Sequence, residues 1–343
     1  MGDPFLSVIV PVRNEERYVE RCLYSLARQD YGHDRFEVIV VDGRSEDATR
    51  PIVNRFAAEA TLDVRLLDNP RRKTAAGLNV GLDAARGEVI VRVDGHASVA
   101  PDFLRRSVAA LLDTGADCVG GVIESEGDTY MGSVIALAMS SRFGVGGASF
   151  RVGGEGPADT VAFGAYRRDV FSRIGGFTEG IDRGEDDEFN YRLRDHGGTI
   201  LLVPEIRARY TVRGSLGGLW QQYFGYGRAK PEVLRRHPTQ ARLRQLAPAA
   251  FVLALGAAAL QALFRSTASL RILAAVYTGA ATIASLALAS QRRWRYLPPL
   301  PVAFACLHLS YGLGFIVGLL GLAGRLLVWS ARPGIREGSE IPE

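Results

Sequence analysis

The sequence has few cysteines and lacks the glycine-rich loops that hold phosphates in many nucleotide-binding proteins. Its cysteines, Cys22, Cys118 and Cys306, are far apart and show no metal-binding spacing, so each is expected to be a small apolar packing residue in a reducing compartment. The turn after the first apolar run reads PVRNEE, without the glycines of the dinucleotide-binding fingerprint, and no Walker motif is present. A bound nucleotide would therefore need a divalent ion and basic side chains to neutralise its phosphates.

Charge is almost absent from three long apolar stretches that follow residue 244. They cover 246–264, 272–290 and 297–323, each near or above the ~20 residues that cross a bilayer as a helix. Buried helices of a soluble bundle would carry a polar stripe, and these show almost none. We therefore expect about three transmembrane helices in a membrane domain over 246–324. The third stretch has His308 as its one ionisable group and is long enough to tilt or to break at its glycines.

Basic residues flank these stretches unevenly. A basic segment over 229–245 precedes the first stretch and three arginines separate the second from the third, whereas Arg265 and Arg271 alone flank the first loop. The positive-inside rule then keeps the N-terminal domain, 1–228, in the cytoplasm of a multi-pass protein of a bacterial-type inner membrane. The basic segment should also contact anionic membrane lipid. Because these residues explain the pI of about 9.0, we expect no nucleic acid partner, and the remaining residues, 325–343, form a tail.

The first 113 residues alternate four times between a β-branched run and a helical pattern. The runs are LSVIVPV, FEVIVVD, DVRLLD and EVIVRVD, and the helical patterns cover 14–29, 45–60, 74–86 and 101–113. Asn14 is the expected N-cap of the first helix. Four such units predict an α/β fold, a mostly parallel, Rossmann-like sheet with helices on both faces.

In such sheets, ligands bind beyond the carboxyl ends of the strands. The polar candidates there are Arg13 after the first run, Asp42 at the end of the second, and Asp94 with His96 after the fourth. An Asp-Gly pair at a strand end can be a simple turn. Its presence at two of the four ends, at Asp42 and Asp94, favours a binding site instead.

Five motifs in order resemble those of the family 2 inverting glycosyltransferases, which have the GT-A fold. They are SVIVPVRNEERYVERCLYSL, VVDGRSEDAT, KTAAGLNVGL, VRVDGH and GEDDEFNYRLR. Within that family, DGH, SRFGVGG and HLSYGLGF are similar to the membrane-bound enzymes of exopolysaccharide assembly of the succinoglycan ExoA type. The resemblance runs from about residue 5 to about residue 325. It implies transfer of a sugar from a nucleotide diphosphate sugar with inversion at the anomeric carbon.

The resemblance also implies how the donor is held. The family's metal-binding Asp-x-Asp motif falls on Asp94 and His96, and because histidine replaces the second aspartate we expect a divalent ion, Mn²⁺ in preference to Mg²⁺. Asp42 falls where the family places an acid against the nucleobase or ribose, with a simple turn residue as the alternative. The other nucleotide-sugar candidates are Pro11, Arg13 and Glu15 in the first loop, and Lys73 near the diphosphate.

The acidic run GEDDEFNYRLR is expected to supply the base. A single in-line displacement needs a group that takes the proton of the acceptor hydroxyl, and the family's Glu-Asp pair falls on Glu185 and Asp186. Repulsion among the acids should raise at least one pKa, so we predict Asp186 as the base, with Asp187 as the fallback. The segment QQYFGYGR resembles a degenerate Gln-x-x-Arg-Trp region. It offers Gln221, Gln222 and Arg228 for the acceptor and the leaving diphosphate, and its missing tryptophan favours addition of one sugar.

The sequence thus predicts a membrane-anchored inverting hexosyltransferase, with UDP-glucose as the favoured donor and a polyprenyl-diphosphate-linked oligosaccharide as acceptor. Its apolar segment 131–151 either lies at the membrane interface or forms a buried helix. Two alternatives remain open. One is a transferase that loads a sugar onto polyprenyl phosphate, where a base is less necessary. The other is a nucleotide-sugar-binding scaffold without turnover, which would be expected to have lost Asp94 or the acidic run.

Overall fold

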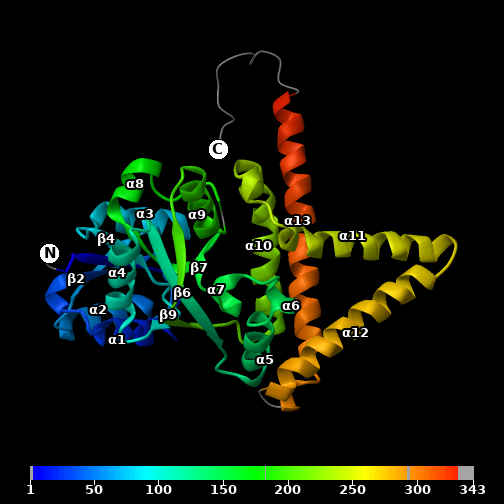
Figure 1. Ribbon diagram of the computed structural model, residues 1–343, viewed down its shortest axis with the longest axis horizontal. Helices are drawn as coiled ribbons and strands as arrows, with labels where there is room; N and C mark the ends of the chain where they lie inside the picture. The colour runs from blue at the N-terminus through cyan, green and yellow to red at the C-terminus, as the bar shows by residue number, and fades with distance from the viewer. Residues whose placement is uncertain (1–2, 182, 292–293, 331–343) are drawn as a thin grey trace. The chain divides into compact units, whose positions relative to one another are not determined.

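The computed structural model describes residues 3–181, 183–291 and 294–330. The chain divides into two compact units, Met1–Val212 and Arg213–Glu343, and each is described by itself (Figure 1). Residue 228, the predicted end of the cytoplasmic domain, lies within helix α10 (Leu216–Arg236), and the predicted domain boundaries stay a prediction. Most of the predicted tail, 325–343, lies outside the described residues.

The predicted strands form the parallel half of the sheet in the first unit. Strands β3, β2, β1 and β4 lie side by side in that order and run parallel. Their bounds are β1 (Leu6–Val12), β2 (Phe36–Asp42), β3 (Asp63–Asp68) and β4 (Val89–Arg92). Every residue of β2 and β4 is buried, as expected for β-branched strands covered on both faces. The α/β fold with its mostly parallel sheet is confirmed.

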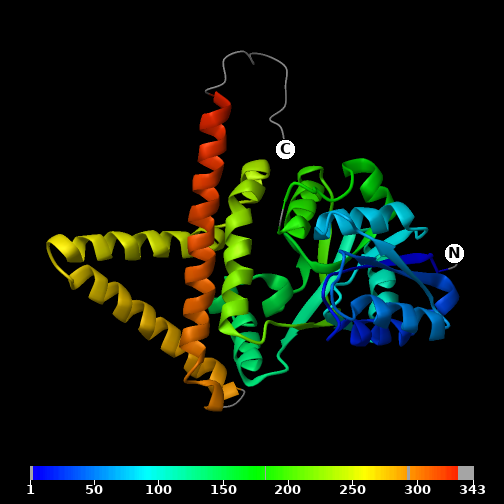
Figure 2. The same ribbon diagram turned by 180° about the vertical axis from the view of Figure 1, so that it is seen from behind.

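The predicted helices follow these strands. They are α1 (Val19–Ala27), α2 (Thr49–Glu59), α3 (Thr74–Ala84) and α4 (Phe103–Thr114). Figures 1 and 2 show α1 and α2 on one face of the parallel strands and α3 on the other. In α1 the buried residues Val19, Cys22, Leu23 and Leu26 recur at helical spacing and form the apolar stripe that packs on the sheet.

The predicted N-cap at Asn14 is wrong. Helix α1 begins at Val19 after Tyr18, which makes no side-chain cap, and Asn14 has a left-handed φ of 56°. Its amide donates to Ser45 Oγ at 2.8 Å, and its Oδ1 accepts from the Glu46 amide at 2.9 Å. Asn14 therefore joins the loop after β1 to the loop after β2, which brings two strand ends together.

The second half of the sheet has mixed directions. Strand β8 (Ala162–Arg167) runs antiparallel between β4 and β6 (Cys118–Glu126), and β6 is parallel to β9 (Ile200–Thr211). Two short strands, β5 (Ala97–Val99) and β7 (Gly156–Pro157), pair antiparallel with β9. The helices of this half are α5 (Tyr130–Met139), α6 (Arg142–Val145), α7 (Ser149–Val152), α8 (Arg168–Ile174) and α9 (Glu185–Asp195). In α5, Val134, Ile135 and Met139 are fully buried, which favours the buried-helix interpretation of 131–151.

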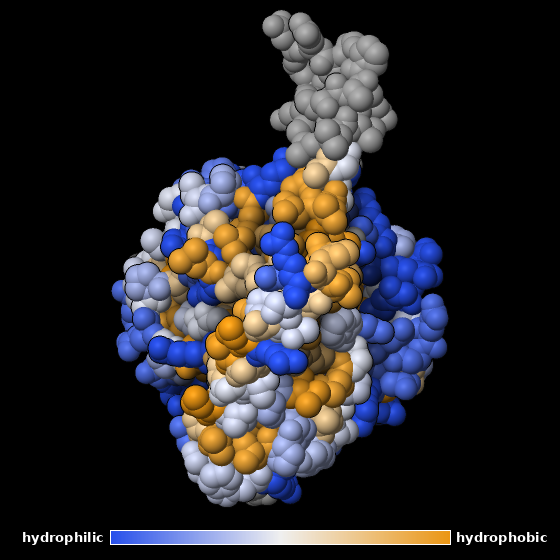
Figure 3. Space-filling view, turned by 90° about the vertical axis from the view of Figure 1, so that its right-hand side faces the viewer, coloured by the Kyte–Doolittle hydropathy of each residue, from blue (hydrophilic) through white to orange (hydrophobic). Residues whose placement is uncertain are grey.

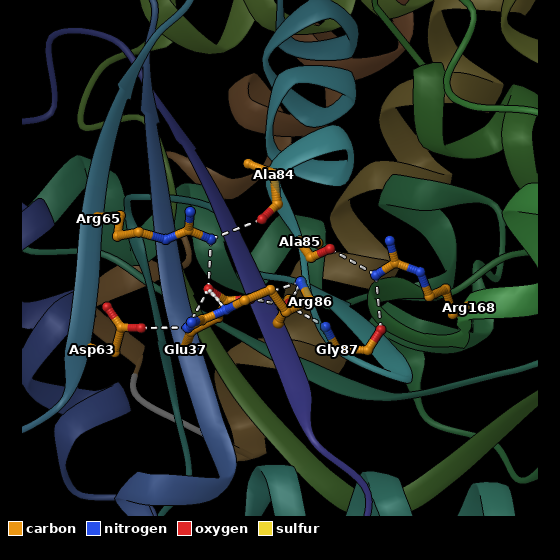
Figure 4. Close-up of polar contacts among 9 residues, drawn as sticks. Glu37, Asp63, Arg65, Ala84, Ala85, Arg86, Gly87 and Arg168 are labelled. Atoms are coloured by element: carbon orange, nitrogen blue, oxygen red, sulfur yellow. Dashed lines mark hydrogen bonds and ion pairs between the residues drawn. The ribbon is translucent and has the colours of Figure 1, made fainter.

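A buried carboxylate lies near the amino ends of the parallel strands (Figure 4). Glu37 is fully buried on β2 and accepts hydrogen bonds from Ser7 Oγ at 2.6 Å, from the Arg86 amide at 2.9 Å and from Arg65 Nη2 at 2.6 Å. Burial alone would raise the pKa of Glu37, but these hydrogen bonds outweigh it and lower the pKa. The cluster ties β1, β2, β3 and the turn after α3 together.

Replacing Glu37 with glutamine is expected to destabilise the first unit by about 2–3 kcal/mol. This is below the ~3–5 kcal/mol cost of breaking a fully buried pair, because Arg65 and Arg86 are 36% and 57% exposed. A lowered carboxylate pKa stabilises the fold above the unfolded pKa, and this stabilisation is lost as pH falls through the folded pKa. Thermal unfolding should therefore separate wild type from variant at pH 7 and bring them together as the pH falls below the ordinary range of a glutamate. Asp63→Asn, which removes an exposed partner of Arg86, should shift the midpoint little.

The second unit contains the apolar helices. They are α11 (Leu243–Phe264), α12 (Ala268–Gln291) and α13 (Leu300–Ser330), and over the described residues three helices are long and apolar enough to cross a membrane. The third is one unbroken helix that begins at Leu300 and has Pro301 in its first turn. Side chains such as Leu253, Leu263 and Ile272 are largely exposed, and apolar side chains make up much of the face shown in Figure 3. Short 3₁₀ turns lie at His33–Arg35, Pro238–Gln240 and Trp294–Tyr296.

Glycines let α10 pack closely on α13. A Cβ placed on Gly314 would lie 2.2 Å from the Phe224 carbonyl oxygen, and one on Gly318 would lie 2.2 Å from that of Arg228. From the other side, a Cβ on Gly227 would lie 2.1 Å from the Tyr311 carbonyl oxygen. Small residues at such positions let helix backbones approach, as is common between membrane helices. Helix α10, with its charged residues, is thereby fixed along an apolar helix.

Candidate active site

The site lies where β4 ends. Beyond Arg92 the chain makes a turn in which the Ala97 amide donates to the Asp94 carbonyl oxygen at 2.9 Å. A Cβ on Gly95 would lie 2.6 Å from Cγ1 of Val12, so the turn needs glycine to approach the end of β1. Gly95 is thus constrained by its position, and the polar side chains of Asp94 and His96 lie on either side of the close approach.

Arg92, the last residue of β4, holds acids from two distant segments. It is only 9% exposed. Its Nε and Nη2 lie 3.2 and 3.1 Å from Asp94 Oδ1, Nη2 donates to Glu185 Oε1 at 2.9 Å, and Nη1 lies 3.9 Å from Asp186 Oδ2. Burial alone would lower the pKa of Arg92, but the charges of Asp94, Glu185 and Asp186 raise it. The guanidinium is therefore permanently charged and brings the strand end and the first turn of α9 together.

The four acids in the first turn of α9 have different surroundings. Glu185 is buried against Arg92, and Glu188 is buried and accepts from Arg192 Nε at 3.0 Å one turn later. Asp186 is about a third exposed, and its Oδ1 accepts from the Asp187 amide at 2.9 Å. Two acids are therefore committed to arginines at close range, while Asp186 stays accessible at the helix N-terminus.

The pKa of Asp186 is raised to about 7. Partial burial of its side chain is the main cause, and the nearby charges of Glu185 and Asp187 add to it, while Arg92 opposes them. A carboxyl group that titrates near neutral pH is suited to accept a proton and release it again. The arrangement thus holds a carboxyl group that could act as a base near Arg92, which also contacts Asp94 at the end of β4.

His96 is paired with Glu15 from the loop after β1. Its Nδ1 lies 2.9 Å from Glu15 Oε1, and its ring meets that of Tyr210 edge-on at 4.9 Å between centroids. Burial alone would lower the pKa of His96, but Tyr210 and Glu15 raise it to about 10. The bond to Glu15 orients the ring and leaves Nε2 as the nitrogen that could coordinate an ion.

Asp42 is fully buried at the end of β2 and is occupied by neighbours. Its carboxylate accepts from Ser45 Oγ at 2.5 Å and from Arg50 Nη1 at 2.9 Å. Arg50 also contacts Asp68 Oδ1 at 2.6 Å, at the end of the adjacent strand β3. These contacts shape the loop after β2, so a nucleotide at this edge would meet Asp42 within an ordered turn.

The other candidates of the first unit lie at the same edge. Pro11 is a partly exposed residue near the end of β1, and Arg13 is exposed just beyond it. Lys73 is exposed at the N-cap position of α3. Its neighbour Arg71 forms an ion pair with Glu179. The edge thus carries basic side chains as well as acids.

The remaining candidates lie in the second unit. Gln221, Gln222 and Arg228 are all on α10, where Gln222 is buried and its Nε2 donates to Tyr226 Oη at 3.3 Å. Gln221 and Arg228 are exposed. Their roles stay predictions.

Two described features were missed from the sequence. Arg92 was taken as part of a buried run, although a single charge within VIVRVD required a buried counter-charge. Tyr166 of β8 donates to Asn190 Oδ1 of α9 at 2.9 Å and lies close to Arg92, and no sequence motif indicated it. Among the described residues, no group of three or more His, Cys, Asp or Glu is placed to hold a metal ion.

The mixed sheet, with acids at the carboxyl edge of its parallel half, defines the GT-A class of glycosyltransferases. The model of the family described as "Glycosyl transferase family 2" matches residues 7–175. The succinoglycan biosynthesis protein ExoA of Rhizobium meliloti is 31% identical over 322 residues, which cover 93% of this chain and 96% of that protein. The chain therefore belongs to glycosyl transferase family 2 and is a glycosyltransferase.

Two further similarities agree with this assignment. A Methanococcus voltae enzyme, dolichyl N-acetyl-alpha-D-glucosaminyl phosphate 3-beta-D-2,3-diacetamido-2,3-dideoxy-beta-D-glucuronosyltransferase, is 28% identical over 68% of this chain and 74% of its own. The solved structure of the mannosyltransferase PcManGT from Pyrobaculum calidifontis, in complex with GDP-Man and Mn²⁺, matches with a TM-score of 0.62 at 24% identity. That match covers 91% of this chain and 88% of the other and shows the shared fold.

Proposed function

We propose that the protein is a membrane-anchored inverting hexosyltransferase of surface polysaccharide biosynthesis. It moves a hexose, glucose from UDP-glucose as the favoured case, to a hydroxyl of a polyprenyl-diphosphate-linked oligosaccharide. The observation that carries the proposal is the array in which Arg92 joins Asp94 at the strand end to Glu185 and Asp186 at the start of α9. It supplies a donor-side acid and a base of suitable pKa at one edge of a glycosyltransferase sheet.

Asp94 and His96 would hold a divalent ion on the donor side. One carboxylate and one imidazole suit Mn²⁺, and substrate phosphates commonly complete such a site. Glu15 supports this reading, because a carboxylate on the far nitrogen is the usual partner of a metal-binding histidine. The ion would have to displace the proton that the raised pKa keeps on His96. When bound, it stabilises the negative charge of the leaving nucleoside diphosphate.

The residues of α9 act on the acceptor side. Asp186 accepts the proton of the acceptor hydroxyl as its oxygen bonds to the anomeric carbon and the bond from sugar to phosphate breaks. The displacement is in line, so an α-linked donor gives a β-linked product. Glu185, held by Arg92, keeps the first turn of α9 in place. Nucleotide contacts are proposed for Pro11, Arg13, Glu15, Asp42 and Lys73.

The acceptor is proposed from the second unit and from the relatives. Three helices that could span a membrane support a lipid surface as the site of action, and the names of the relatives refer to succinoglycan biosynthesis and to a dolichyl-phosphate-linked sugar. The excess of basic residues before α11 and between α12 and α13 supports a cytoplasmic catalytic unit in a bacterial-type inner membrane. On α10, Gln221, Gln222 and Arg228 are proposed to contact the acceptor or the diphosphate.

A donor assay tests this function. Detergent-purified protein is given UDP-glucose, other UDP-sugars, dTDP-sugars and GDP-mannose, with Mn²⁺, Mg²⁺ or EDTA and a lipid-linked oligosaccharide. We expect release of a nucleoside diphosphate from one donor, strongest with Mn²⁺ and abolished by EDTA. Release in EDTA at the full rate would contradict the metal site. No release from any donor, although nucleotide binds, would contradict the proposed transfer.

A further inference from the structure

Arg92 occupies an unusual position for a charged side chain. Strand β4 lies between β1 and β8, with Arg92 paired to Ile9 of β1, and all four residues of the strand are buried. Burying a guanidinium is costly unless charged partners compensate it. An arginine at this place in the sheet therefore needs a reason that an apolar residue would not satisfy.

The guanidinium contacts acids in different directions. Nε and Nη2 face Asp94, and Nη2 also reaches Glu185, which is 93 residues further along the chain. Nη1 is buried without a hydrogen bond and lies 3.9 Å from Asp186 Oδ2. A planar guanidinium with several N–H donors can contact several carboxylates at once, whereas a lysine ammonium acts as a point charge.

The charge balance differs from that of the Glu37 cluster. There, Glu37 and Asp63 face Arg65 and Arg86, two acids against two cations. Around Arg92, three carboxylates face one cation. Both clusters link separate elements, but the one at the carboxyl edge keeps excess negative charge and an unsatisfied donor nitrogen beside Asp186.

We propose that Arg92 is a positioning residue that joins the donor end of the site to its base by holding Asp94, Glu185 and Asp186 in one array. The inference deepens the proposed function and rests on the roles given there to Asp94 and Asp186. Arg92 fixes the distance between the two ends and supplies the positive charge that keeps Asp186 ionised.

The groups that face Asp186 support this role. Glu185 and Asp187 from its own helix favour the protonated carboxyl, as does burial, and the Tyr166 hydroxyl of β8 is near. Of the charges that act most strongly on Asp186, that of Arg92 lowers its pKa, and the hydrogen bond from the Asp187 amide lowers it further. Without Arg92 the carboxyl would hold its proton at neutral pH and would not accept another from the acceptor.

The test compares Arg92→Met and Arg92→Lys with wild type across pH. Methionine keeps the length of the stem and removes the charge. We expect the acidic limb of kcat/KM to move upward by about one pH unit or more and kcat at pH 7 to fall at least tenfold, with the lysine variant in between. Arg192→Met is the matched control, because Arg192 is a partly buried arginine on α9 that pairs with the buried Glu188. It should lower the thermal midpoint and leave the acidic limb where it is.

The proposal would be overturned if Arg92→Met folds and the acidic limb of its kcat/KM profile does not move. An arginine that merely stabilises the fold would change the thermal midpoint and leave the pH profile unchanged. If Arg92→Met does not fold, Arg92→Lys decides by the same criterion.

Thermal midpoints give a second readout that needs no turnover. In a double-mutant cycle of Arg92→Met with Asp186→Asn, we expect the double variant to lose less than the sum of the single losses, because the asparagine relieves repulsion that the arginine had balanced. If the losses in thermal midpoint of the two single variants add up to that of the double variant, the proposal would be overturned. If Asp186→Asn keeps full activity and the wild-type acidic limb, the proposed base is wrong, and the cycle still decides the role of Arg92.

Discussion

Replacing Asp186 with asparagine is expected to lower kcat about 100- to 10,000-fold, the usual contribution of a general base. The amide keeps the size of the side chain and cannot take a proton from the acceptor hydroxyl. Because the pKa of Asp186 is raised to about 7, wild-type kcat/KM should fall below pH 7 as the carboxyl becomes protonated. The variant should lack that limb. Both are measured as nucleoside diphosphate release at saturating donor and varied acceptor concentration from pH 5 to 9.

The neighbouring acid is the control for this prediction. Asp187→Asn changes the same helix turn by the same atoms and should cost less than tenfold, and a larger loss than at Asp186 would move the base to Asp187. A small loss at both positions would favour the alternative acceptor, polyprenyl phosphate, whose oxygen is already ionised. Transfer to polyprenyl phosphate in place of the lipid-linked oligosaccharide would then be detected directly.

The central strands of the parallel half were predictable because they are buried on both faces. The runs at 6–12 and 36–42 coincide with β1 and β2, since continuous β-branched sequence leaves little alternative to a central strand. The run at 63–68 coincides with β3, an edge strand that is at most partly buried. Asn14 failed as a cap because Ser45 and Glu46, some 31 and 32 residues away in sequence, offered better partners. A local sequence pattern cannot indicate a contact between residues so far apart in the chain.

The mixed half of the sheet could not be predicted from local sequence patterns. Strand β8 pairs antiparallel with β4, so that Ala165 faces Val91 from 74 positions further along the chain. Its short run, AFGAYR, contains a glycine and no alternation that would indicate an edge or a centre. Pairing across such separations is decided by the packing of the whole unit.

The acidic run shows why the site was predictable by region and not by residue. The letters EDDE indicated a base somewhere in four positions. The structure separates them, because Glu185 pairs with Arg92 and Glu188 with Arg192, and the raised pKa falls on Asp186. Each partner lies on another strand or another turn, so only the folded chain distinguishes four similar side chains.

Replacing Asp94 with asparagine is expected to lower kcat/KM about 100- to 1,000-fold, the range seen when one group that stabilises developing charge is removed. The amide keeps the side-chain shape and loses the charge that would hold a divalent ion against the donor diphosphate. The loss should therefore be accompanied by a higher Mn²⁺ concentration for half-maximal rate. A titration of activity against Mn²⁺ at fixed donor measures both effects.

Asp63→Asn is the control for Asp94, because it removes the same charge at the opposite edge of the sheet, where Asp63 pairs with the half-exposed Arg86. It should leave the Mn²⁺ dependence unchanged. Since Asp94 also accepts two contacts from Arg92, the thermal midpoint of Asp94→Asn is recorded beside its activity. A variant that folds normally and keeps the wild-type Mn²⁺ dependence would remove Asp94 from the donor site. Retained metal dependence would then have to come from residues other than the acid that ends VIVRVD.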